Sequence, residues 1–117
     1  MSPLKITVQD AVTGPVLEIA GDLDHATAHE LRQAVDRLTL AGGHVLVLDL
    51  AGLEFVDSSG ITALLAARNL AMEQNGDIAL AAVPANTARI LRIVGLDRVF
   101  TLHPDTSTAT DPRSSGR

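Results

Sequence analysis

The sequence has 117 residues, a length that predicts one domain, and it contains no cysteine, which excludes disulfides, thiolate zinc sites and thiol nucleophiles. Its net charge of −5 argues against binding to nucleic acid phosphates, and an aromatic content of 2% leaves few rings on which sugars or bases could stack. No apolar stretch approaches the ~20 residues of a membrane span, and the N-terminus lacks the apolar run of a signal peptide. We therefore expect a cytoplasmic domain that contacts neither nucleic acid nor membrane.

The chain opens with a predicted β-hairpin. Apolar and polar side chains alternate over residues 4–8, as in a half-buried strand. A turn follows at residues 13–15, and residues 16–20 form a second apolar run, which Gly21 is expected to break.

The first predicted helix covers residues 28–38, where apolar side chains recur at spacings of three and four. Thr27 and Glu30 have the spacing of a capping box, in which each side chain binds the other residue's amide. The glycines at 42 and 43 are expected to end the helix.

A central strand and a buried helix follow. Residues 45–50 are almost continuously apolar, which predicts a strand buried on both faces. Residues 51–57 are expected to form a loop. The helix that begins near Ser58 is apolar on nearly all sides over residues 61–67, and it should close at Asn75 and Gly76.

The last predicted elements are a buried strand over residues 78–83, a third helix over 84–95 and a short strand over 99–102. The apolar face of the third helix comprises Ile90, Leu91 and Val94.

The order β-β-α-β-α-β-α-β predicts an α/β domain over residues 1–102, with a mixed β-sheet and helices packed against it. Residues 103–117 are rich in Pro, Asp, Thr, Ser and Gly and are expected to be a disordered tail.

The most informative motif is Asp57-Ser58-Ser59-Gly60 at a helix start. A phosphate on a serine there would meet the unsatisfied amides and the positive end of the helix dipole. The alternative is a simple helix cap, because Asp and Ser are favoured N-caps, and position alone favours it. Both interpretations hold together if Asp57 caps the helix and Ser58 is modified.

Two histidines suggest a possible metal site, but their positions argue against it. His25 and His29 are four residues apart, but a helix capped by Thr27 leaves His25 outside it, and no HExxH pattern is present. We therefore predict no metal ligands.

Carboxylates occur in pairs at Asp22 and Asp24 and at Glu54 and Asp57, where ordinary loop and cap positions explain them. The single lysine, Lys5, lies at the wrong end for a P-loop or for a phospho-acceptor receiver domain. Asp-Ser-Ser-Gly is also not the G-x-S-x-G elbow of a hydrolase.

Four segments together resemble STAS domains. Residues 21–28 resemble the G-x-L-D segment before the first STAS helix, residues 48–50 and 55–61 the signature strand and loop, and residues 84–96 the third-helix segment. The similarity covers about residues 4–102. Among STAS proteins, the Asp-Ser-Ser-Gly motif is most similar to that of the bacterial anti-sigma factor antagonists.

This resemblance implies a switch without catalysis or a cofactor in this chain. In that family the first serine of the motif, here Ser58, is phosphorylated by an anti-sigma factor that is also a serine/threonine kinase and supplies the ATP. The unphosphorylated antagonist binds the anti-sigma factor and frees the sigma factor for transcription. A phosphoserine phosphatase resets the switch.

The predicted partner-binding residues are Asp22, Asp24, His25, Asp57, Ser58, Ser59 and Gly60. Position 26 is Ala, where related sequences often carry a polar residue. Two other functions stay open. One is a non-switching STAS subunit of a transporter or a stress-signalling scaffold, and the other is a small hydrolase or acyl carrier that uses Ser58.

Overall fold

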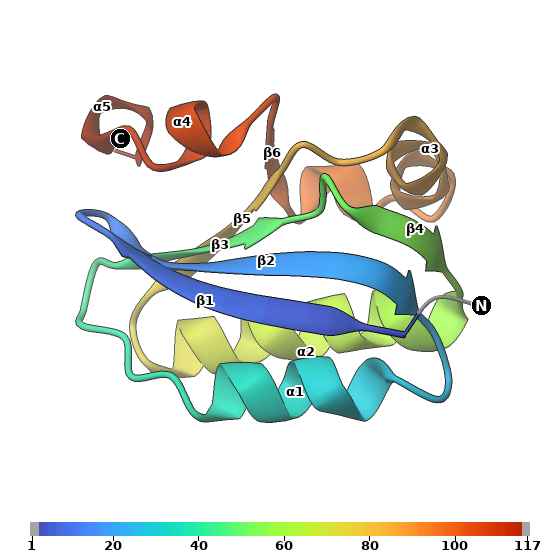
Figure 1. Cartoon of the computed structure of the whole chain (residues 1–117). Helices are drawn as coiled ribbons and strands as arrows, with labels where there is room; N and C mark the ends of the chain where they lie inside the picture. The colour runs from blue at the N-terminus through green and yellow to red at the C-terminus, as the bar shows by residue number, and fades with distance from the viewer. Residues whose placement is uncertain (1–2, 116–117) are drawn as a thin grey trace.

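The computed structural model describes residues 3–115, which form a sheet with helices on both sides (Figure 1). The strands are β1 (Lys5–Ala11), β2 (Gly14–Leu23), β3 (Val45–Asp49), β4 (Leu53–Val56), β5 (Asp77–Ala81) and β6 (Thr101–His103). The helices are α1 (Ala28–Asp36), α2 (Ser58–Glu73), α3 (Ala85–Ile93), the 3₁₀ helix η1 (Leu96–Arg98), α4 (Thr106–Ala109) and α5 (Pro112–Ser115).

The sheet is mixed, as the sequence predicts. Its strand order is β1-β2-β3-β5-β6; β1 and β2 are antiparallel, and the other neighbours in this order are parallel. β2 is long enough to have two partners in succession. Residues 16–18 pair with β3, and residues 21–23 pair with β4, with a shift of register between Gly21 and Asp22. The end of β2 therefore runs beside the segment that leads into α2.

The main core lies between the sheet and the pair α1 and α2, which cover one face (Figure 1). Alternate residues along β2, β3 and β5 belong to this core, because successive side chains of a strand point to opposite faces of the sheet. The fully buried members of this core include Leu17, Leu46, Leu48, Leu64 and Leu80. This packing positions the start of α2, where Gly60, Ala63 and Leu64 are buried, at one end of the sheet.

Two local predictions for the sheet are wrong. Gly21 adopts a φ of 97° and lies within β2 instead of ending it, since the strand continues through a bulge to Leu23. Residues 53–56 form β4 rather than a loop; Leu53 and Val56 are buried, while Glu54 and Phe55 are exposed. A four-residue strand with this pattern does not show the alternation by which strands are recognised.

The boundaries of the first helix also differ from the prediction. α1 ends at Asp36, before the two glycines. The predicted capping box does not form, because the Thr27 side chain makes no cap hydrogen bond. Its hydroxyl instead donates to the Asp22 carbonyl oxygen at 2.8 Å, which closes the loop before the helix.

The segment after His103 differs from the expected disordered tail. It carries α4 and α5, which lie over the sheet face opposite α1 and α2 (Figure 1). Ala109 is only 1% exposed and packs in a small cluster with Val16, Val47 and Ala81. The Thr13 hydroxyl also donates to the Thr110 carbonyl oxygen at 3.4 Å. An apolar residue at the right place thus anchors a segment whose composition is otherwise that of a tail.

Candidate functional site

Asp57 is the N-cap of α2. Its backbone is extended, and its Oδ1 atom accepts a hydrogen bond from the Gly60 amide at 2.9 Å. Its Oδ2 atom accepts one from the His25 amide at 3.1 Å. One carboxylate therefore satisfies a free amide of the helix start and also ties the loop after β2 to that helix.

Gly60 allows α2 to approach the end of β2. It is buried, and a Cβ atom added there would collide with the Leu23 carbonyl oxygen and lie 2.6 Å from Val56 Cγ2. A side chain at this position would push the first turn of the helix away from the sheet. The last residue of the motif is therefore required for packing.

The loop of residues 22–27 is held by its own hydrogen bonds. Asp24 Oδ1 accepts from the amides of Ala26, at 3.0 Å, and Thr27, at 3.2 Å. The Asp24 amide in turn donates to the Thr27 hydroxyl oxygen at 2.9 Å. Because Asp57 holds the amide of His25, this loop lies directly beside the start of α2. The structure thus brings together two segments that the sequence analysis assigned to one surface.

Ser58 is exposed at the first position of α2, while Ser59 is partly buried. The Ser58 carbonyl oxygen accepts a hydrogen bond from the Thr62 hydroxyl at 2.9 Å, but no described residue holds the Ser58 hydroxyl by a hydrogen bond. Since Asp57 caps the helix, the Ser58 hydroxyl is left open to solvent and to a partner.

An apolar groove of about 380 Å³ runs beside Ser58, between the start of α2 and the end of α3. It is lined by Val56, Asp57, Ser58, Ile61, Thr62, Ile90, Val94 and Leu96. The adjoining Ile93 is 73% exposed and Val94 is 55% exposed. Exposed aliphatic side chains next to an apolar groove are typical of a protein-docking surface.

This groove was missed by the sequence analysis, which placed Val94 on the buried face of its helix. α3 ends at Ile93, and Gly95 turns the chain with a φ of 80°. Val94 is therefore the C-cap, beyond the last residue of the helix, and Leu91 takes the fully buried position. The sequence did contain one indication of this surface, because Ile93 and Val94 are adjacent apolar residues. Adjacent residues of a helix point in different directions, so a helix with one buried face cannot bury both.

One member of each carboxylate pair noted in the sequence, Asp24 and Asp57, has a structural role. The side chains of Asp24 and Asp57 accept backbone hydrogen bonds, so a structural role accounts for both. Together with Asp22 they concentrate negative charge beside Ser58. Among the residues that line the apolar groove, Asp57 is acidic, and the loop that carries Asp24 is tied to it through the His25 amide.

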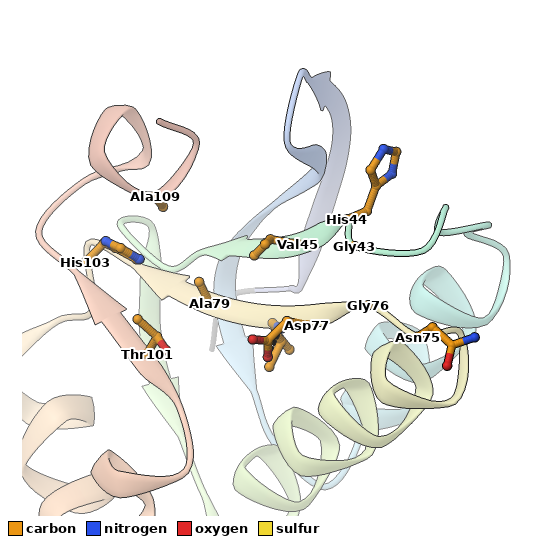
Figure 2. Close-up of a pocket in the computed structure, with 11 residues that line it drawn as sticks. Gly43, His44, Val45, Asn75, Gly76, Asp77, Ala79, Thr101, His103 and Ala109 are labelled. Atoms are coloured by element: carbon orange, nitrogen blue, oxygen red, sulfur yellow. Dashed lines mark hydrogen bonds between the residues drawn. The ribbon is translucent and has the colours of Figure 1, made fainter. Parts of the chain in front are cut away.

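A larger hollow of about 420 Å³ lies at the other end of the sheet, along β3, β5 and β6 (Figure 2). Its two histidines, His44 and His103, lie well apart from each other in Figure 2. Asp77 Oδ1 accepts the amide of its own neighbour Ile78 at 2.8 Å. These polar groups do not converge on one point, so the hollow lacks the arrangement of a catalytic site.

No group of three or more potential ligands that could hold a metal ion occurs among residues 3–115. His25 lies in the turn before α1, which begins at Ala28, so it does not share a helix face with His29. Within the same residues, none of the helices combines the length and the apolar character needed to cross a membrane.

Comparison with known proteins agrees with this geometry. The family model described as "Mlab, STAS domain" matches residues 6–104. The anti-sigma-F factor antagonist RsfB of Mycobacterium tuberculosis is 32% identical over 99 residues, which are 85% of this chain and 80% of RsfB.

Solved structures show the same fold. The crystal structure of an anti-sigma factor antagonist from Mycobacterium paratuberculosis superposes with a TM-score of 0.79 and 29% identity, covering 92% of this chain and 94% of that one. The Bacillus cell fate determinant SpoIIAA in its phosphorylated form superposes with a TM-score of 0.67 and 17% identity, covering 90% and 96%. At that identity, SpoIIAA supports the fold alone.

The mixed sheet, with α1 and α2 on one face and the Asp57-capped start of α2 beside the end of β2, defines a STAS-type α/β domain. The chain belongs to the STAS-domain family, and its relatives include anti-sigma factor antagonists.

Proposed function

We propose that this chain is an anti-sigma factor antagonist whose binding is switched off by phosphorylation of Ser58. In its unphosphorylated form it binds an anti-sigma factor and so frees the sigma factor for transcription. The anti-sigma factor is also the serine/threonine kinase that supplies ATP, and a phosphoserine phosphatase reverses the modification. This chain is then a ligand and a kinase substrate, not an enzyme.

The observation that carries the proposal is the exposed Ser58 hydroxyl beside an apolar groove. A kinase needs a hydroxyl that it can reach, and Asp57 leaves Ser58 without a capping role. Ser59 is partly buried, which makes it the less accessible acceptor of the two.

The groove supports a docking role for the same surface. Its apolar lining supplies area that a partner would cover, and burial contributes about 25 cal/mol per Å² of apolar surface. Asp22, Asp24 and Asp57 form the acidic side of this surface, which suits a basic patch on the anti-sigma factor. Burial of the apolar lining would favour binding, and the acidic residues would orient the anti-sigma factor on this surface.

Phosphorylation would act locally. A phosphate adds about −1.5 to −2 charge at neutral pH. The helix N-terminus already holds the Asp57 carboxylate, so the phosphate would be repelled by that carboxylate and would face the partner across the groove. A loss of ~3 to 4 kcal/mol would weaken binding by two to three decades without any refolding.

The proposal is tested by intact-mass measurement after incubation with the cognate anti-sigma kinase and ATP. We expect one phosphate, lost in Ser58→Ala and kept in the matched control Ser59→Ala. A phosphate kept in Ser58→Ala but lost in Ser59→Ala would move the site by one residue and leave the function standing.

Two further outcomes would overturn the proposal. If no cognate kinase modifies the chain, a non-switching STAS subunit of a transporter or stress-signalling scaffold becomes the better interpretation. If the purified protein turns over an ester substrate, and Ser58→Ala abolishes that turnover, the serine is a nucleophile instead.

A further inference from the structure

The outer edge of β1 is open. β1 is the terminal strand of the sheet in the described chain and pairs with β2 alone (Figure 1). Pro15 has no amide hydrogen, so its partner Asp10 belongs to a pair without mutual hydrogen bonds. Because the pattern alternates, the amides and carbonyls of Ile6 and Val8 also point away from β2, toward the open edge.

This edge is also apolar on the side of α1. Val8 is 51% exposed, and together with Ile6 it lines a hollow of about 350 Å³ between β1 and α1. Ala34 and Leu38 form the helix side of the hollow. A long edge strand with unpaired backbone groups and exposed aliphatic side chains is a template for another strand.

Opposite charges flank the same hollow. Glu30 and Arg37 lie seven residues apart on one side of α1 and its C-terminal cap, with Ala34 between them. Neither side chain makes an ion pair with any of residues 3–115. When a second copy is turned by a two-fold axis through the middle of this stripe, Glu30 of each copy approaches Arg37 of the other. The face is therefore complementary to itself.

We propose that the β1 edge pairs with the β1 edge of a second copy of this chain, in antiparallel orientation about a two-fold axis at Thr7. Ile6 of each copy then lies opposite Val8 of the other as a mutually hydrogen-bonded pair, and the two Thr7 residues face each other. Moving the axis to Val8 would put Asp10 opposite Ile6, which sets a carboxylate against an aliphatic side chain.

The dimer goes beyond the proposed switch and does not depend on it. The residues around this edge line a different hollow from the groove beside Ser58. Both Ser58 hydroxyls therefore stay accessible, and the assembly would present two docking surfaces on one continuous sheet.

The first test measures the mass of the whole chain in solution by analytical ultracentrifugation over a wide concentration range. We expect a monomer–dimer equilibrium, with a dissociation constant that Val8→Glu raises at least about tenfold. The matched control is Val12→Glu at the hairpin tip, where Val12 is 89% exposed and off this face, and it should change nothing. Circular dichroism checks that both variants fold.

The second test uses the absence of cysteine from the sequence. Thr7→Cys should form a disulfide-linked dimer under mild oxidation, because facing residues of a non-hydrogen-bonded pair are close enough for a disulfide. Thr101→Cys, on the opposite edge strand β6, is the control and should not crosslink at a comparable rate.

The third test reverses charges. Glu30→Arg should weaken the dimer, and the double variant with Arg37→Glu should restore it. A chain that remains monomeric at the highest soluble concentration, with Thr7→Cys crosslinking no faster than Thr101→Cys, would overturn the proposal. A dimer that is insensitive to Val8→Glu would also overturn it, since another face would then be responsible.

Discussion

At the start of α2, Asp57 and Ser58 are both residue types that can cap a helix, but only Asp57 does so. Asp57 fixes the helix end and the loop after β2 through both of its carboxylate oxygens, while Ser58 keeps its hydroxyl exposed. A negative charge at position 58 should therefore affect partner binding far more than folding.

Ser58→Asp tests this separation. We expect weaker binding to the anti-sigma factor, by about tenfold or more, and a nearly unchanged thermal midpoint, because an acidic residue in the first turn suits the helix dipole. Titration calorimetry and a thermal scan measure the two quantities. Ser107→Asp, at an exposed serine of α4, is the control and should bind normally. A large fall in the midpoint of Ser58→Asp would mean that Ser58 is chiefly structural.

Gly60→Ala should destabilise the fold. The new methyl group collides with the backbone of Leu23 and crowds Val56, and overpacking of this kind costs about 1 to 3 kcal/mol. Chemical denaturation measures the loss. Gly42→Ala is the control, since an added Cβ there has nothing within 4 Å. Equal stabilities for the two variants would contradict the close approach of α2 to β2.

The motif could be found from the sequence, but the use of each side chain could not. Asp and Ser at a helix start are both good caps, and which one caps depends on where the loop after β2 lies. Thr27 is a comparable case, because its hydroxyl had a local capping partner and bonds to the Asp22 carbonyl instead. Which hydrogen bond each side chain makes depends on how the loop after β2 is folded and on where it lies relative to α2, and local sequence does not specify either.

At the scale of single elements, the pattern of apolar residues was sufficient to locate the elements that are buried. The strand at residues 45–49 and the helix at 58–73 lie where their apolar patterns predict them. β4 was missed because two buried residues in four carry little pattern, and the paired strand that defines it is more than thirty residues away. Pairing partners distant in sequence are invisible to local patterns.

The short helix α4 should respond to acid. The Thr108 amide donates to Asp105 Oδ1 at 2.8 Å and lowers the pKa of Asp105 below its ordinary value of 3.8. A lowered pKa in the folded state means that the stabilisation is present above the ordinary pKa and is lost as the pH falls through the folded pKa.

Hydrogen exchange of the Thr108 amide across the acid range measures this effect. We expect protection at weakly acidic pH that disappears as Asp105 is protonated, with little pH dependence in Asp105→Asn. Protection that is the same at every pH would show that Asp105 does not hold the helix end.

At the scale of the whole molecule, the fold class and the mixed sheet follow from the alternation of strands and helices, but the covering of the second sheet face does not. Residues after 103 have the composition of a tail, and one alanine among polar residues gives no recognisable pattern. Ala109 nevertheless covers Val16, Val47 and Ala81. Whether a polar segment packs depends on the surface that the rest of the chain leaves open.

Truncation tests whether the segment after His103 stabilises the domain by packing on the sheet or is a tail that contributes nothing. A chain that stops after His103 lacks α4, so the sheet face around Val47 becomes exposed, and we expect a loss of about 1 to 2 kcal/mol and a midpoint several degrees lower. A chain that stops after Thr110 keeps α4 and is the control. Equal midpoints for the two truncations would favour a tail that contributes nothing.

The double pairing of β2 also has a consequence for the order of folding. During synthesis the hairpin of β1 and β2 is complete once residue 23 has emerged, whereas β3 and β4 emerge more than twenty residues later. Until then the inner edge of β2 has no neighbour. A ribosome-bound chain halted when Leu23 has just emerged should consequently be more prone to aggregate or to recruit chaperones than a chain halted after β3 and β4 have emerged.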